Sequence, residues 1–209
     1  MYTLYFSPGT CSLAVHVALL ECNAQFKLER INTFKGEGQK PEYLKINPRG
    51  QVPVLLDGDQ KIIEGAAILL HILDKQNSPL MPRNGKERDE AIQWLMFCNA
   101  TLHPAYGRFF FLKHNASDAA KTELTPIIVK AINKLWNDVE ERLSSSKYLA
   151  GDQVTIADIL MTVIANWGSA FPTAPTIGPK TKQLLKDISS RPAFQKAMQE
   201  ENVTYKAAA

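Results

Sequence analysis

Hydrophobic and polar positions divide the chain into two parts of different character. Short apolar runs alternate with longer periodic runs up to about residue 76, which is typical of a small α/β unit. Strands are expected at 2–6, 28–32, 53–56 and 61–63, and helices are expected from Ser12 and over 65–76.

A hairpin signal lies between the last two predicted strands. Asp57-Gly58-Asp59 is a short polar stretch with a glycine, so these two strands should pair antiparallel. The first two strands are separated by a helix instead, and a strand, helix, strand order predicts parallel pairing.

Everything after residue 86 has helical periodicity. Turn formers and prolines collect over 78–86, so we predict a domain over 1–77, this linker, and an all-helical domain over 87–209. Periodic apolar positions predict helices over 88–115, 121–143, 156–171, 180–188 and 193–199. Thr155 and Asp158 have the spacing of a capping box at the start of the 156–171 helix.

Composition narrows the class of protein. The 209 residues are 45% hydrophobic and 22% charged, which describes a globular chain, and no apolar run approaches the roughly 20 residues of a membrane span. The net charge of +3 is small and the lysines are scattered, which argues against nucleic acid as a partner. An odd number of cysteines, three, and the lack of a signal peptide predict a cytoplasmic location.

Cys11 is the first candidate for chemistry. It follows the first predicted strand and the turn Ser7-Pro-Gly-Thr10, and it precedes the helix from Ser12. Unpaired N–H groups and the helix dipole at that position are expected to favour its thiolate. The alternative is a buried and inert cysteine, because free cysteine often behaves as a small apolar residue.

Two further segments are suited to holding a peptide. Val52 precedes Pro53 at the start of a predicted strand, where its backbone could pair with an extended peptide. Glu64 and Gly65 begin the next helix, where amide groups suit a carboxylate and the Glu64 side chain suits an amine.

The order of these segments resembles the cytosolic glutathione transferases, most closely the bacterial beta class. Ser-Pro-Gly-Thr-Cys-Ser is followed by Asn47-Pro-Arg-Gly-Gln-Val-Pro-Val54, by Glu64-Gly-Ala-Ala-Ile68, and by Asp152-Gln-Val-Thr-Ile-Ala-Asp158. The resemblance implies a thioredoxin-like N-terminal domain and an all-helical C-terminal domain. It also implies glutathione as co-substrate, no metal, a homodimer and a role in detoxification.

The resemblance transfers roles to individual residues. Cys11 matches a cysteine beside the glutathione sulfur. Val52 matches the residue whose backbone pairs with the cysteinyl part of glutathione, and Pro53 matches the cis-proline that follows it. Gln51 belongs to the same glutathione-binding segment. Glu64 and Gly65 match the γ-glutamyl anchor, and Lys35 lies near a basic residue that meets the glycine carboxylate.

The helical domain adds two candidates through the same resemblance. His103 aligns with a histidine that approaches glutathione. Met96 stands where relatives often have an asparagine, for which Asn99 could substitute. Helical spacing places Met96, Asn99 and His103 on one stripe, which Tyr106 and Phe110 continue.

Two chemistries and one rival class stay open. Bound glutathione could attack a small hydrophobic electrophile, or Cys11 could exchange with a disulfide in a reductase or peroxidase reaction. Ser12 competes with Cys11 as the activating group. The rival hypothesis is a non-catalytic binding protein with the same fold.

Overall fold

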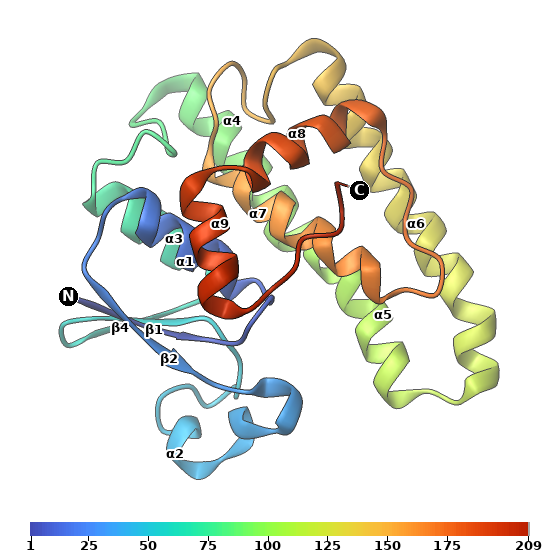
Figure 1. Ribbon diagram of the computed structural model, residues 1–209, viewed down its shortest axis with the longest axis horizontal. Coiled ribbons are helices and arrows are strands. Elements are labelled where there is room, and N and C mark those ends of the chain that lie inside the picture. Colours follow the sequence, from blue (N-terminus) through green and yellow to red (C-terminus); the bar gives the residue numbers. More distant parts are fainter. Residues whose placement is uncertain (209) are drawn as a thin grey trace. The chain divides into compact units, whose positions relative to one another are not determined.

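The computed structural model describes residues 1–208, which form two compact units (Figure 1). Unit 1 contains Met1–Arg83 and Ser190–Thr204, and unit 2 contains Asn84–Ser189 and the residues from Tyr205 onward. The first division falls inside the predicted linker, whereas Ser190–Thr204 had been expected in the helical domain. The domain boundaries themselves stay a prediction, and their last residue, Ala209, lies outside the described residues.

Unit 1 is built on a four-stranded sheet in the order β2-β1-β3-β4. The strands are β1 (Tyr2–Phe6), β2 (Phe26–Arg30), β3 (Val54–Asp57) and β4 (Gln60–Ile63). β1 and β2 are parallel, and the other neighbours are antiparallel, which confirms both predicted pairings.

β2 begins two residues earlier than the sequence pattern indicated. It is an edge strand, and its residues Lys27, Glu29 and Arg30 are exposed. An edge strand has little buried surface, so its apolar pattern marks its ends poorly.

Helices cover the sheet of unit 1 on both sides (Figure 1). α1 (Ser12–Glu21) and α3 (Gly65–Lys75) pack on one face, and the short α2 (Pro41–Leu44) lies on the other. α9 (Pro192–Glu201) packs against α1. Two 3-10 turns, Thr33–Lys35 and Glu37–Gln39, lead from β2 to α2. The alternation along β1 explains the two layers, because Leu4 and Phe6 are buried while Tyr5 packs its ring against Tyr43 of α2.

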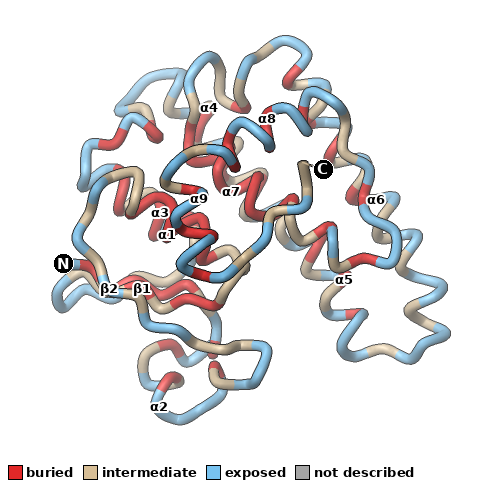
Figure 2. The backbone as a smooth tube through the Cα atoms, viewed as in Figure 1, coloured by how far each residue is buried: buried red, intermediate tan, exposed pale blue. Residues whose placement is uncertain are grey.

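The helix α1 is buried on every side (Figure 2). All eight residues from Ser12 to Leu19 are buried, and α1 contacts β1, α3 and α9. A helix that is apolar around its circumference is stable only where neighbours cover each face.

Apart from an isolated bridge between Tyr148 and Gly151, the regular elements among the described residues of unit 2 are all helical. Its α-helices are α4 (Gly85–Met96), α5 (His103–Asn115), α6 (Asp118–Ser145), α7 (Ile156–Ala165) and α8 (Pro179–Ser189). A π-helical segment, Phe97–Leu102, interrupts the helix predicted over 88–115, and a 3-10 turn, Asn166–Ala170, follows α7. No helix within residues 1–208 combines the length and apolarity needed to cross a bilayer.

The predicted capping box at the start of α7 is present. The buried Asp158 carboxylate accepts hydrogen bonds from the N–H groups of Thr155 (2.8 Å) and Leu149 (2.9 Å). It also accepts one from the Thr155 hydroxyl (3.1 Å). One side chain therefore fixes both the start of α7 and the loop before it.

Replacing Asp158 tests this arrangement. Asp158→Ala leaves two buried N–H groups without their acceptor, so we expect the free energy of unfolding to fall by about 2–4 kcal/mol. Chemical denaturation measures it, and the exposed Asp152→Ala in the same loop is the control. Equal stability of the two variants would contradict the assigned role.

Candidate functional site

The turn that carries Cys11 is held by its own hydroxyl groups. Ser12 Oγ accepts a hydrogen bond from the Ser7 N–H (3.2 Å) and lies 3.1 Å from the Ser7 carbonyl oxygen, to which it can donate. Thr10 Oγ1 lies 2.9 Å from both the Ser7 carbonyl oxygen and Ser12 Oγ. Ser12 is fully buried, so its hydroxyl is engaged in shaping the turn.

Cys11 lies at the N-cap of α1, where the residue keeps some exposed surface although its sulfur is largely enclosed by protein. Its Sγ is 3.8 Å from the carbonyl oxygen of Val52, to which the thiol donates. Cys11 and Val52, 41 residues apart in sequence, are therefore neighbours, as the order of motifs predicted.

The expectation that the Cys11 thiolate is favoured is wrong for this structure. Removal of the sulfur from solvent raises the pKa of the Cys11 thiol to about 11. The N–H groups of Cys11 and Ser12 act in the opposite direction but are outweighed, and the negative charge of Glu64 raises the pKa further. Cys11 is a thiol near neutral pH.

The loop before β3 presents Val52 through a set of backbone restraints. The Val52–Pro53 peptide bond is cis, and Pro53 is buried. The carbonyl oxygen of Gln51 accepts hydrogen bonds from Tyr43 Oη (2.7 Å) and Asn47 Nδ2 (2.8 Å). These side chains fix the direction of the chain as it enters the cis bond.

Glu64 has a positive φ angle, which residues other than glycine rarely adopt. Its φ of 71° and ψ of 116° lie outside the usual region for a residue with a side chain, directly before Gly65 at the start of α3. Such strain costs about 1–3 kcal/mol and concentrates at functional sites. The exposed Glu64 carboxylate forms an ion pair with Arg49.

The sequence pattern predicts no role for Arg49. It lies in the segment that begins at Asn47, and folding brings it to Glu64. Lys35, by contrast, is an exposed side chain on the 3-10 turn after β2.

Asn99 and His103 belong to unit 2, where a change in helix type alters the predicted stripe. The π-helical segment that contains Asn99 has more residues per turn than an α-helix, so the spacing from Met96 to His103 no longer defines one face. The predicted continuous stripe is therefore wrong at its start.

The other three residues of the predicted stripe do lie together, because their rings all contact the indole of Trp167. The ring centroids of His103, Tyr106 and Phe110 lie 4.8, 6.1 and 6.2 Å from that of Trp167. Tyr106 is fully buried and accepts a hydrogen bond from Trp136 Nε1 (3.0 Å). Desolvation lowers the pKa of His103, which favours its neutral form.

Within residues 1–208, no group of three or more histidine, cysteine, aspartate or glutamate side chains is arranged to hold a metal ion. The geometry that the chain does present is a thiol, a carbonyl and a carboxylate in unit 1.

Comparisons with known proteins identify the family of the chain. Residues 1–74 match the glutathione S-transferase N-terminal domain, and residues 94–192 match the glutathione S-transferase C-terminal domain. The chain is 30% identical to glutathione S-transferase 3 of Zea mays, over 95% of this chain and 92% of that protein. The chain therefore belongs to the glutathione S-transferase family.

Two other similar proteins bear on fold and chemistry. The structure of a glutathione S-transferase from Xylella fastidiosa aligns with a TM-score of 0.88 at 26% identity, covering 98% of this chain and all of that one. The disulfide-bond oxidoreductase YfcG of Escherichia coli K12 is 26% identical, over 95% of this chain and 94% of that protein. The predicted fold class is confirmed.

The raised pKa of Cys11 has a measurable consequence. In a Cys22→Ala/Cys98→Ala background, alkylation of Cys11 by iodoacetamide should accelerate about tenfold per pH unit between about pH 7 and about pH 9, because only the thiolate reacts. Quenched samples analysed by intact mass give the rate. A plateau below about pH 8.5 would show that the thiolate is favoured after all.

Proposed function

We propose that this protein binds glutathione in unit 1 and activates the glutathione thiol for transfer to small hydrophobic electrophiles. The observation that carries the proposal is the convergence on Cys11. The Cys11 thiol lies at the start of α1, contacts the Val52 carbonyl, and is close enough to Glu64 for that charge to influence its pKa.

Each end of the tripeptide has a proposed partner. Glutathione pairs in an extended form with the backbone at Val52, beside Pro53 and Gln51. Its γ-glutamyl end lies at Glu64 and Gly65, where the carboxylate of Glu64 receives the amine and the first amides of α3 receive the carboxylate.

The remaining proposed contacts involve Lys35, Asn99 and His103. Lys35 is proposed for the glycine carboxylate because it is a basic, exposed side chain in the same unit. The roles of Asn99 and His103 toward glutathione derive from the resemblance and stay predictions.

Arg49 modifies the proposed anchor. In the absence of ligand it neutralises Glu64, and an incoming ammonium group replaces it as the ion-pair partner. The released guanidinium is then available to the γ-glutamyl carboxylate.

Protonated Cys11 determines the proposed activation step. A thiol that keeps its proton donates an S–H hydrogen bond to the glutathione sulfur and stabilises the glutathione thiolate. That thiolate attacks an electrophilic carbon, a C–S bond forms, and the leaving group departs with the electron pair. We assign this role to Cys11 and a supporting one to Ser12, whose hydroxyl shapes the turn.

Thiol–disulfide exchange is a second candidate, favoured by the similarity to a named disulfide-bond oxidoreductase. The Cys11 thiolate would attack the glutathione sulfur of a disulfide between glutathione and another small thiol, break its S–S bond, form a Cys11–glutathione mixed disulfide and release the other compound as its thiolate. A second glutathione thiolate would then attack the mixed disulfide, regenerate Cys11 and release oxidised glutathione.

The cellular compartment, the oligomeric state and the biological role are proposed from composition and from the family resemblance. Three cysteines without a disulfide among them fit a reducing, cytoplasmic compartment. A two-fold homodimer and a role in detoxification follow from the family resemblance.

Binding of the γ-glutamyl end can be tested at Glu64. Glu64→Gln removes the negative charge that receives the ammonium group, so we expect the dissociation constant for glutathione to rise at least about tenfold. Isothermal titration measures it, with the exposed Asp59→Asn in the same unit as the control. If the unaltered protein neither binds glutathione nor shows thiol-dependent activity, the non-catalytic hypothesis replaces this one.

The redox candidate has its own test. Incubation with oxidised glutathione should add one glutathione per chain by intact mass, because Cys11 is the thiol placed at the proposed site. Cys11→Ala should prevent the adduct, whereas Cys22→Ala and Cys98→Ala should not. An adduct that persists in Cys11→Ala would remove Cys11 from the exchange reaction.

A further inference from the structure

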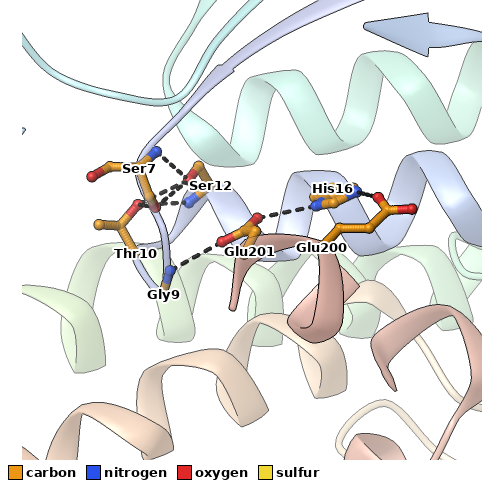
Figure 3. A network of polar contacts seen from close by, with 7 residues as sticks. All are labelled: Ser7, Gly9, Thr10, Ser12, His16, Glu200 and Glu201. Atoms are coloured by element: carbon orange, nitrogen blue, oxygen red, sulfur yellow. Dashed lines mark hydrogen bonds and ion pairs between the residues drawn. The ribbon is translucent and has the colours of Figure 1, made fainter. Parts of the chain in front are cut away.

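A buried histidine lies between two carboxylates in a polar network within unit 1 (Figure 3). His16, on the fully buried stretch of α1, has no exposed surface. Its Nδ1 is 3.1 Å from Glu201 Oε1, and its Nε2 is 3.0 Å from Glu200 Oε2. Both carboxylates lie at the C-terminal end of α9.

Glu201 connects this network to the turn before Cys11. Its side chain is fully buried, and its second oxygen, Oε2, accepts a hydrogen bond from the Gly9 N–H at 3.0 Å. Gly9 has a φ of 70°, and Cys11 follows two residues later. One carboxylate thus fixes both His16 and the backbone of the turn, across 192 residues of sequence.

The contacts of Glu201 with His16 and Gly9 form one clamp between α1 and α9, and a second clamp joins the same two helices at their other ends. Arg191 forms two hydrogen bonds to Glu21, from Nε at 2.7 Å and from Nη2 at 2.8 Å. Since Glu21 ends α1 and Arg191 precedes α9, the helices run antiparallel with one clamp at each end. Of these two clamps, the one at Glu201 contacts the turn before Cys11. Variants of the two clamps therefore separate an effect on this turn from an effect on the docking of α9.

We propose that Glu201 is a positioning residue for Cys11. Through Gly9 and His16 it sets the path of the turn, and it thereby holds the thiol in its shielded position against Val52. The proposal extends the proposed function, because it names a residue outside the glutathione contacts that governs the reactive thiol.

The number of hydrogens that the His16 contacts require indicates which substitutions at position 201 preserve the hydrogen bonds. Two contacts between ring nitrogens and carboxylate oxygens need two hydrogens, and a neutral imidazole supplies one. A glutamine at position 201 supplies an N–H to His16 Nδ1 and still offers an oxygen to Gly9. Glu201→Gln therefore keeps both contacts, whereas Glu201→Met has similar size and keeps neither.

Loss of these contacts should release the thiol. In Glu201→Met the Gly9 N–H and His16 Nδ1 lose a buried partner, so the turn opens more readily. Cys11 then leaves the environment that raises its pKa, and its reaction with a neutral alkylating agent becomes faster.

The experiment measures iodoacetamide labelling at Cys11 and at Cys22, peptide by peptide, in the full-length protein. For Glu201→Met we expect the Cys11 rate to rise about fivefold or more, with Cys22 within about twofold of the unaltered protein. Glu201→Gln should keep both rates within about twofold of the unaltered protein. A Cys11 rate in Glu201→Met that equals the rate in Glu201→Gln would overturn the proposal.

Glu21→Gln is the matched control for helix docking. It weakens the far clamp and removes a charge that raises the pKa of Cys22, so it should accelerate labelling of Cys22 and leave Cys11 unchanged. Acceleration of Cys11 by Glu21→Gln as large as that by Glu201→Met would mean that Glu201 acts only by docking α9.

One further variant and one property of the labelling assay keep the outcomes separate. If Glu201→Met does not fold by circular dichroism, Glu201→Asp replaces it, because the shorter carboxylate cannot reach both Gly9 and His16; an unchanged Cys11 rate would then contradict the proposal. The labelling contains no glutathione, so it gives its answer even if glutathione fails to bind and the proposed function is wrong.

Discussion

The burial of α1 on every side is the constraint on which the rest of unit 1 depends. A helix without an exposed face needs the sheet, α3 and α9 around it, and its few polar side chains need partners inside the protein. Ser12 finds them in the backbone of Ser7, and His16 finds them in two carboxylates of α9. The shape of the turn before Cys11 and the attachment of a distant helix are both results of enclosing one helix.

Local signals explain how much of the fold could be predicted from the sequence. The hairpin, the parallel pairing and the capping box each involve residues that are near in sequence or joined by one helix, and all three are confirmed. The π-helical segment at Phe97–Leu102 and the place of α9 in unit 1 were missed. Apolar periodicity reveals that a helix has a buried face, but it does not reveal which partner covers that face.

The candidate site also contains features that the sequence predicted and features that it did not. The order of motifs brought Cys11, Val52 and Glu64 forward as one group, and Cys11 does meet Val52 in the structure. The protonation state of Cys11 could not be predicted, because a helix start is visible in sequence whereas the depth of the sulfur is not. Arg49 escaped notice because an exposed arginine has no pattern of its own until its partner is known.

The composition of unit 1 also bears on the order in which the protein matures. Chains fold as they are synthesised, from the N-terminus onward, and the strands and α1 are made before residues 84–189. Until α9 has been made, one face of α1 lacks its cover and His16 lacks its carboxylates. The thiol-bearing turn can reach its final form only after the intervening helical unit has been translated, so the earliest part of the chain is among the last to be completed.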